Sequence, residues 1–203
     1  MKLGLFGGSF DPPHLGHLAL ARQARDQLVL DEVRWIPAGQ PWQKAGQALA
    51  PTMHRVAMVQ AMIEREPRMR VDDIEARRDG PTYTIDTVLA VRDALPHATL
   101  YLLIGQDQYA RLHTWHRWRE LLSMVTLAVA ARGGATPLPP PELIAVWHRM
   151  VVLEMAPVAV SATAVRAAAA AGADLAALVG DAVAGYIDRH ALYRAPPTPA
   201  TRS

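Results

Sequence analysis

Short runs of apolar residues alternate along this chain with longer amphipathic stretches. The apolar runs predict about six strands, at Lys2–Phe6, Glu32–Pro37, Arg70–Ile74, Thr99–Ile104, Val125–Ala131 and Val151–Glu154. Helical patterns lie between them, at Leu15–Leu30, Thr52–Arg65, Thr84–Leu95 and Gln108–Leu122. Because parallel strands need crossover helices, this alternation predicts an α/β fold with a doubly wound parallel sheet and helices on both faces.

The rest of the chain departs from this alternation in four places. Residues 161–194 are helical in pattern, with Gly172 dividing the alanine-rich part into two short helices, and we expect them to close a single domain over residues 1–194. The loop Ala38–Pro51 is long enough to suggest a functional role, and Gly133–Pro141 is expected to be a surface excursion. The polar, proline-rich tail 195–203 is predicted to be disordered.

Composition excludes several classes of protein. The formal net charge of +2 is too small for a nucleic-acid binder that relies on a basic stripe. The absence of cysteine excludes thiol catalysis, disulfides and cysteine-ligated metals. No stretch approaches the roughly 18 apolar residues of a membrane span, and no secretory pattern begins the chain. We therefore expect a cytoplasmic protein without nucleic-acid or membrane partners, and the sequence leaves open whether it forms a homo-oligomer.

The first predicted strand ends in a glycine-rich loop, GGSFDPPHLGH, from Gly7 to His17. Glycine lets backbone N–H groups approach an anion closely, and a helix N-terminus favours negative charge. The loop matches neither the G-x-G-x-x-G nor the G-x-x-x-x-G-K-[ST] phosphate motif. Instead His14 and His17, three residues apart, should lie on one face of the helix start. Capping or surface histidines and a histidine metal site are alternatives, but the setting favours donation to phosphoryl oxygens.

A second anion site is predicted at VSATAVR, residues 160–166. Ser161 follows an extended segment and precedes an alanine-rich helix, so it is a natural N-cap. Arg166 lies one turn further and can close over a phosphate. The alternative is a plain cap with a solvated arginine. Together with the histidine pair, the two helix starts could hold a triphosphate between them.

These segments resemble the nucleotidyltransferase superfamily, with its G-x-F-x-P-x-H-x-G-H loop and later S-x-T-x-x-R segment. Further segments are similar to those of bacterial nicotinate-nucleotide adenylyltransferases: PTYTIDT at 81–87, IGQD at 104–107, Trp115, and YIDRHALYR at 186–194. The resemblance spans essentially residues 1–194. It implies a Rossmann-like domain that joins ATP, with Mg²⁺, to nicotinate mononucleotide in NAD biosynthesis.

The resemblance also implies roles for individual residues. His14, His17 and Arg166 would be catalytic, with His14 closest to the reacting α-phosphate. ATP would be bound by Gly7, Gly8, Ser9, Phe10, Gly105, Asp107, Arg132, Ser161 and Thr163, of which Gly105 and Asp107 hold ribose. The mononucleotide would be bound by Ser9, Lys44, Tyr83, Thr84 and Trp115. The protein itself is not expected to supply metal ligands, although Asp11 would assist Mg²⁺ indirectly.

Several of these roles have structural alternatives. Thr84 could be an ordinary helix N-cap, and Asp107 could cap the helix that follows the fourth strand. Trp115 could stack on a pyridine ring, or Trp115 and Trp118 could both be core residues. His113 and His116 repeat the three-residue spacing without a glycine-rich loop, so we expect them at the surface.

The implied reaction needs no general base, because the attacking 5′-phosphate is already ionised at pH 7. Catalysis would consist of holding two repelling anions together and neutralising the charge of the transition state. Two other functions are compatible with the motifs: a different adenylyltransferase of the superfamily, such as one acting on pantetheine phosphate, and a non-catalytic nucleotide-binding module.

Overall fold

Six parallel strands form the central sheet of the computed structural model, which describes residues 1–41, 49–131 and 136–194. Their order is β4-β2-β1-β6-β7-β8. The strands are β1 (Lys2–Gly8), β2 (Glu32–Pro37), β4 (Met69–Val71), β6 (Thr99–Gly105), β7 (Thr126–Ala130) and β8 (Arg149–Leu153). Because β1 pairs with both β2 and β6, the strand order reverses there, and ligands of such sheets bind beyond the carboxyl ends at that point. The predicted doubly wound parallel sheet is confirmed.

Each face of the sheet carries its own hydrophobic core. Leu3 and Leu5 of β1 point into one core and Phe6 into the other, as the two-residue period of a strand requires. Since both faces are covered, the strands consist of nearly continuous apolar runs rather than alternating polar and apolar residues. This explains why short apolar runs were the visible signal in the sequence.

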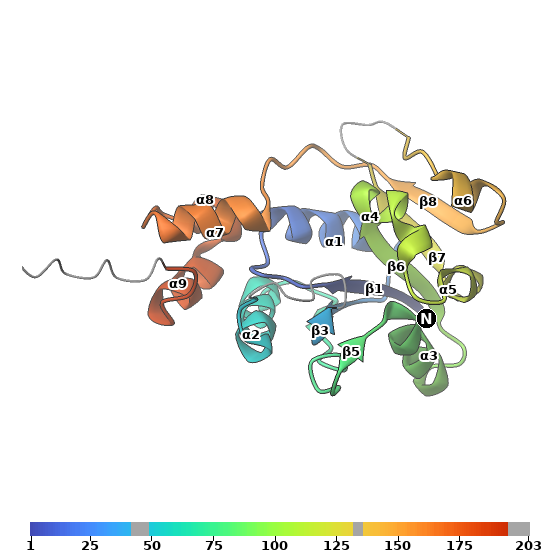
Figure 1. Ribbon diagram of the computed structural model, residues 1–203, viewed down its shortest axis with the longest axis horizontal. Helices are drawn as coiled ribbons and strands as arrows, with labels where there is room; N and C mark the ends of the chain where they lie inside the picture. Colours follow the sequence, from blue (N-terminus) through green and yellow to red (C-terminus); the bar gives the residue numbers. More distant parts are fainter. Residues whose placement is uncertain (42–48, 132–135, 195–203) are drawn as a thin grey trace, which may run out of the picture.

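The helices divide between these two cores. On one side lie α1 (Leu15–Gln27), α2 (Thr52–Ile63), α7 (Ala162–Ala170), α8 (Ala176–Val179) and α9 (Asp181–Arg189). On the other lie α3 (Thr84–Ala94), α4 (Gln106–Ala110), the 3₁₀ turn η2 (Leu112–Thr114) and α5 (Trp118–Met124), with α6 (Pro141–Ile144) beside β8. Figure 1 shows α7, α8 and α9 gathered at the end of the molecule near α2, away from α3 and α5.

Two sequence predictions are wrong in detail. The expected strand Arg70–Ile74 is β4, which ends at Val71 because this edge strand pairs only with β2. The expected helix Gln108–Leu122 is broken into α4, η2 and α5, since Trp115 is extended and Arg117 has φ 50° in the left-handed region. Two further strands, β3 (Gln40–Pro41) and β5 (Pro81–Thr82), form a small separate pair. The other predicted helices end one to three residues earlier than expected.

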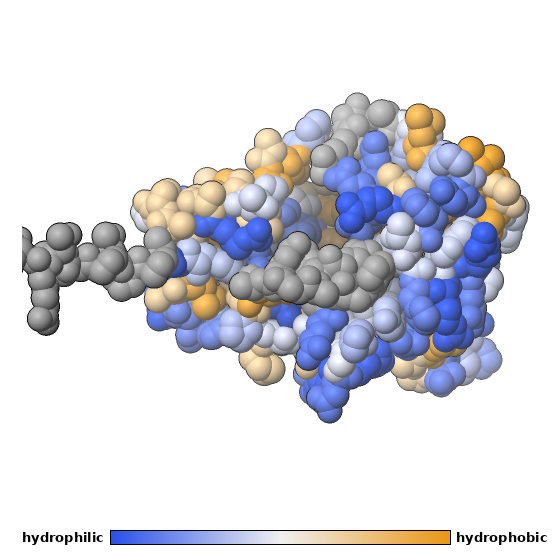
Figure 2. All heavy atoms as spheres, in the orientation of Figure 1, coloured by the Kyte–Doolittle hydropathy of each residue, from blue (hydrophilic) through white to orange (hydrophobic). Residues whose placement is uncertain are grey.

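The C-terminal helices follow the predicted pattern. Gly172 has φ +70° and separates α7 from the residues that lead to α8, which confirms the division of the alanine-rich stretch. In Figure 2, hydrophobic residues gather over these helices and near α6, where Ile144 and Trp147 are exposed. None of the helices in the described part of the chain is long and apolar enough to cross a membrane. The predicted disordered tail lies outside the described residues.

Candidate active site

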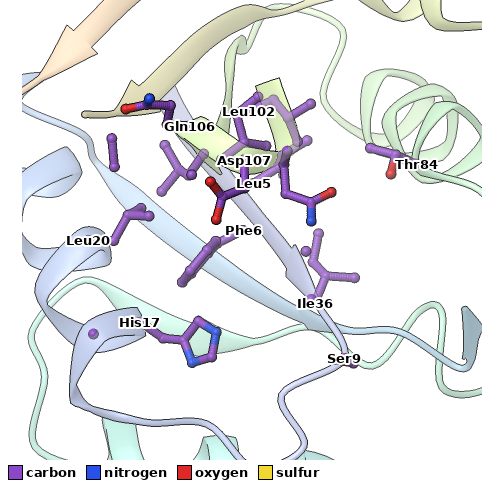
Figure 3. Close-up of a pocket in the computed structure, with 18 of the residues that line it drawn as sticks. Leu5, Phe6, Ser9, His17, Leu20, Ile36, Thr84, Leu102, Gln106 and Asp107 are labelled. Carbon is purple, nitrogen blue, oxygen red and sulfur yellow. The ribbon is translucent and has the colours of Figure 1, made fainter. Parts of the chain in front are cut away.

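A cavity of about 480 Å³ opens at the carboxyl ends of β1, β2, β6 and β7, where the strand order reverses. Its volume suits a small ligand. Ten of the residues predicted from the sequence line it: Gly7, Gly8, Ser9, His14, His17, Thr84, Gly105, Asp107, Trp115 and Ser161. The close-up in Figure 3 shows His17 on one side, Thr84 on the opposite side at the start of α3, and Asp107 between them.

We call one side of the cavity the histidine end, defined by Gly8, His14, His17 and Ser161, and the other the threonine end, defined by Glu75, Thr82, Thr84, Thr87 and Trp115. The histidine end is built from the starts of α1 and α7. The threonine end is built from the β4–α3 connection, α3 and the turn before α5. Residues of both ends carry buried polar atoms with no hydrogen-bond partner among the described residues: His14 Nδ1 and Trp115 Nε1. Since buried polar groups are normally paired, these atoms suggest a polar ligand.

The two histidines of the glycine loop form one stacked unit. Their rings lie 3.7 Å apart between centroids at an interplanar angle of 25°. The backbone N–H of His14, the N-cap of α1, donates to Nδ1 of His17 at 3.2 Å. Because Nδ1 accepts this bond, the proton of the neutral His17 ring is on Nε2. The predicted common orientation of the two rings is confirmed, and the His17 ring also packs edge-on against Phe10.

Gly16 permits the close approach that this unit needs. A Cβ at Gly16 would lie 3.1 Å from His14 Nδ1 and 3.2 Å from the Val160 side chain. Contacts this tight would push α1 away from the segment that leads into α7. The glycine therefore lets the two helix starts lie against one another.

His14 is uncharged at neutral pH. Its side chain is 9% exposed, and burial lowers the pKa of His14 to about 4. A neutral imidazole still has one N–H donor, so the predicted donation to phosphoryl oxygens does not require a charged ring. A polyanionic ligand would itself favour protonation, because an opposite charge nearby raises the pKa of histidine.

The second predicted anion site adjoins the first. Ser161 is the N-cap of α7, and its Oγ accepts a hydrogen bond from the Ala164 N–H at 3.2 Å, as expected for a cap. Arg166 donates from Nη1 to the Asp11 carbonyl at 2.7 Å and from Nη2 to Thr163 Oγ1 at 3.3 Å. Arg166 and Thr163 thus lie beside the glycine loop but do not line the cavity.

Asp11 anchors the glycine loop rather than facing the cavity. Its carboxylate is 1% exposed, and Oδ1 accepts hydrogen bonds from the Tyr193 hydroxyl at 2.7 Å and the Ala50 N–H at 3.1 Å. The predicted indirect assistance to Mg²⁺ does not fit this position, because the carboxylate is turned toward the protein and does not line the cavity. Asp11 instead ties the C-terminal segment to the loop.

Arg55 is a buried residue that the sequence analysis missed. It is 1% exposed, and its guanidinium donates to the carbonyls of Ser9 at 2.8 Å, Ala38 at 2.6 Å and Gly39 at 3.0 Å. It also donates to the Ala50 carbonyl at 3.0 Å. These bonds join the glycine loop to the end of β2 and the start of α2. The available signal was the position of Arg55 on the apolar stripe of α2, one turn before Met58 and Val59.

The threonine end places two of the predicted mononucleotide-binding residues on the cavity wall. Thr84 is the first residue of α3 and the N-cap is Tyr83, so the N-cap interpretation of Thr84 is wrong. Trp115 lines the cavity, whereas Trp118 is buried in the core. Tyr83 does not line the cavity and packs against the exposed His116 ring at 4.5 Å, which brings the Trp115 turn next to Thr84.

The remaining predicted residues occupy different positions. Phe10 is buried against Phe6 and Trp35, so its side chain supports the His17 ring from the core. Asp107 lies in the first turn of α4, two residues after the end of β6 at Gly105. Lys44 and Arg132 lie outside the described residues. No group of three or more His, Asp or Glu side chains within the described ranges is arranged to hold a metal ion.

Comparisons with known proteins agree with this geometry. The model of the family described as cytidylyltransferase-like matches residues 5–168. A protein of Methylibium petroleiphilum named "Probable nicotinate-nucleotide adenylyltransferase" is 56% identical over 200 residues, covering 97% of this chain and 93% of that protein. A protein of Bordetella petrii with the same name is 47% identical, covering 95% of this chain and 99% of its own length.

A solved structure shows the same fold at low sequence identity. It is the nicotinic acid mononucleotide adenylyltransferase of Plasmodium falciparum in complex with NaAD, with a TM-score of 0.79 and 16% identity. The alignment covers 95% of this chain and 97% of that one. A second structure of the same enzyme, in complex with APC, gives a TM-score of 0.77 over 95% of this chain and 96% of that one.

Proposed function

The chain belongs to the cytidylyltransferase-like family and, within it, to the nicotinate-nucleotide adenylyltransferases, and from this premise we propose the reaction that its cavity performs. It transfers the adenylyl group of ATP to the 5′-phosphate of nicotinate mononucleotide. The products are nicotinate adenine dinucleotide and pyrophosphate, a step of NAD biosynthesis.

The observation that carries this proposal is the difference between the two ends of the cavity. The histidine end offers backbone N–H groups at helix starts and imidazole donors, which suit phosphates. The threonine end offers the Trp115 ring and the start of α3, which suit a flat ring with a carboxylate. A dinucleotide with a pyridine at one end and a central pyrophosphate requires both.

In the reaction, an oxygen of the mononucleotide phosphate forms a bond to the α-phosphorus of ATP, and the bond from that phosphorus to the β-phosphate oxygen breaks. His14 and His17 donate hydrogen bonds where charge builds up on the α-phosphoryl oxygens. Gly7, Gly8 and Ser9 place main-chain groups beside the same oxygens. The stacked geometry of the two rings keeps both donors fixed before the substrate arrives.

The leaving pyrophosphate is held by the second helix start. Ser161 and Thr163 lie at the start of α7, and Arg166 is one turn further along. Arg166 now donates to the Asp11 carbonyl, 155 residues away in the sequence, and a rotation of its side chain would carry its charge to the phosphates. Lys44 and Arg132 add cations from the two segments outside the described residues.

Mg²⁺ enters this site with ATP. Within the described residues no group of three or more His, Asp or Glu side chains is arranged to hold it, so its ligands would be phosphate oxygens, water and at most one or two carboxylates. When bound, it neutralises phosphate charge. The chain's own residues hold the phosphates, orient the attacking oxygen and supply the hydrogen-bond donors.

The nucleosides occupy the two sides of the phosphates. Gly105 and Asp107 at the junction of β6 and α4 bind a ribose, since a carboxylate can accept hydrogen bonds from both hydroxyls. At the threonine end, Trp115 stacks on the pyridine ring, and the first turn of α3 at Thr84 meets its carboxylate, with Tyr83 fixing that turn.

Pyrophosphate release tests the proposal directly. Purified protein with ATP and Mg²⁺ is given nicotinate mononucleotide, nicotinamide mononucleotide or pantetheine phosphate in parallel. We expect the largest kcat/KM with nicotinate mononucleotide and a dinucleotide product of matching mass. Preference for pantetheine phosphate would assign the chain to another activity of the superfamily, and no release with any substrate would indicate a non-catalytic module.

A further inference from the structure

The buried carboxyl of Glu75 has no part in the reaction described so far. Glu75 lies in the connection between β4 and β5 and is 7% exposed, yet it lines the cavity at the threonine end. Its neighbours on the cavity wall include Thr82 and Thr87. A carboxyl in such a position is either a structural anchor or a group that meets the ligand.

Glu75 is hydrogen-bonded but forms no ion pair with another described residue. The Thr87 hydroxyl donates to its Oε1 at 2.7 Å. Across residues 1–41, 49–131 and 136–194, no Lys, Arg or His forms an ion pair with it. Burying an ionised carboxylate without an ion-pair partner is costly, so burial shifts Glu75 toward its neutral form.

The charged groups around Glu75 have opposite effects on its carboxyl, and these effects partly cancel. Arg78 of the same connection attracts a negative charge there, whereas Asp86 of α3 repels it, and Asp86 itself faces Arg117 at 3.9 Å. Burial raises the pKa of Glu75, and the hydrogen bonds from Thr87 and Thr82 and the charge of Arg78 offset part of that increase.

The surroundings hold this carboxyl in place and leave a polar atom for a ligand. A Cβ at Gly39 would lie 2.3 Å from the Glu75 carbonyl oxygen, so the end of β2 packs directly on its backbone. At the same end of the cavity, Trp115 Nε1 has no hydrogen-bond partner among the described residues. The wall beside Glu75 therefore suits the polar substituent of a flat ring rather than an apolar group.

We propose that Glu75 is a specificity-determining residue that meets the substituent of the pyridine ring as a neutral acid and favours a carboxylate there over a carboxamide. This inference rests on the proposed function and deepens it. With Oε1 bonded to Thr87, the O–H on the other oxygen is the donor. A hydrogen bond to a carboxylate is roughly twice as strong as one to a neutral carbonyl.

Loss of the Glu75 proton would reverse the preference for a carboxylate over a carboxamide. An ionised Glu75 repels a ligand carboxylate and accepts a hydrogen bond from the N–H of a carboxamide. Selectivity for nicotinate over nicotinamide mononucleotide should therefore fall as pH rises through the pKa of Glu75 in the protein.

The test measures how the ratio of the affinities for nicotinate and nicotinamide mononucleotide changes with pH. The affinity for nicotinate mononucleotide, from its KM, is compared with that for nicotinamide mononucleotide, from its inhibition constant, between about pH 5.5 and 9. Both ligands carry the same 5′-phosphate, whose second pKa is about 6, so its titration and that of the histidines cancel in the ratio. We expect the ratio to fall about tenfold across the range, the scale of one charge-assisted hydrogen bond.

Three variants make the test specific. Glu75→Gln keeps a donor and cannot ionise, so its ratio should stay high and independent of pH. Glu75→Met fills the space without a donor and should lower the ratio about tenfold at acidic pH. The matched control, Asp86→Asn, removes a neighbouring carboxylate and should keep the pH dependence with its midpoint moved to lower pH.

Several results would overturn the inference. A ratio that is independent of pH in the unmodified protein would do so, even if the Glu75 variants did not fold. So would a ratio in Glu75→Gln that falls with pH as in the unmodified protein. A purely structural Glu75 would change stability in Glu75→Met and leave the ratio unchanged. Absence of pyrophosphate release with either mononucleotide contradicts the proposed function instead.

Discussion

The two ends of the cavity are built in different ways. The histidine end is largely one continuous segment, Gly7–His17, completed by Ser161 at the start of α7. The threonine end collects side chains from the β4–α3 connection, from α3 and from the turn before α5. A site made from backbone N–H groups and a helix start needs glycines and fixed spacing, so it leaves a motif in the sequence. A site made from side chains of several elements leaves no single motif: the PTYTIDT segment holds Thr82, Thr84 and Thr87, whereas Glu75 and Trp115 lie outside it.

The two ends also respond differently to protons. Each has a buried titratable group, His14 or Glu75, whose neutral form burial favours. The pKa of His14 is lowered and the pKa of Glu75 is raised. The histidine end therefore becomes charged on acidification and the threonine end on alkalinisation. If the two ends act separately, a substitution at one end should leave the contacts of the other end unchanged.

The largest effect is expected from His14→Ala. Loss of one transition-state donor should lower kcat at least about 100-fold, with little change in the KM for nicotinate mononucleotide. Steady-state kinetics of pyrophosphate release measure both. His97→Ala is the control, because His97 is exposed in the turn before β6. Turnover near that of the control, with the fold intact by circular dichroism, would contradict the assignment of His14.

Trp115→Ala should act on the opposite end. Loss of stacking worth about 1 to 3 kcal/mol predicts an increase of roughly fivefold or more in the KM for the mononucleotide, with the KM for ATP nearly unchanged. The matched variant is Trp118→Ala, whose residue is buried in the core and should lose stability instead. An equal change in both KM values for Trp115→Ala would mean that the two ends are not independent.

Tyr193→Phe should weaken only the histidine end. The variant removes the hydrogen bond from the Tyr193 hydroxyl to Asp11 Oδ1, which is worth about 1.5 to 3 kcal/mol for a bond to a charged group. Urea unfolding should show a loss of about that size. The KM for ATP should rise, because the glycine loop is less well held. Unchanged unfolding free energy would show that this contact adds nothing to the anchoring of the loop.

The smallest expected effect is a change in the unfolding free energy with pH. His14 has a folded pKa of about 4, below its unfolded value of about 6.5, so the unfolded chain binds a proton first as pH falls. The unfolding free energy should therefore drop by about 1 kcal/mol between pH 7 and 5.5 through this residue. Glu75 acts in the opposite direction at higher pH, since its raised pKa adds stability that is lost as pH rises.

Urea denaturation at a series of pH values separates the two groups. His14→Gln should remove the destabilisation on acidification, whereas Glu75→Gln should leave it intact. An unchanged acid slope in His14→Gln would show that His14 is not neutral in the folded protein.

The sequence predicted the histidine end well and the threonine end only in part, through Thr84 and Trp115. The spacing of His14 and His17 and the Ser161 cap carried over to the structure. Arg55 was missed, although a charged residue on the apolar stripe of α2 was visible. Glu75 was missed because a glutamate in a polar connection has no local feature that distinguishes a buried residue from a solvated one.

The errors in the predicted secondary-structure elements have a similar origin. The pattern 108–122 suits one helix, but the chain turns at Trp115 and Arg117, and this turn brings the Trp115 ring to the cavity. Helix propensity is a weak preference that tertiary contacts override. The proposed roles of Lys44 and Arg132 remain predictions from the resemblance.

The sequence by itself determined the parallel sheet, its two helical layers and the anion site after the first strand. These depend on periods of two and 3.6 residues and on local backbone geometry, which neighbouring residues specify. Only the tertiary structure decided that Tyr193 bonds to Asp11, that Arg55 joins three segments, and that Glu75 is buried at the cavity. Those relations join residues far apart in the chain, and their energies come from burial, which the folded arrangement alone creates.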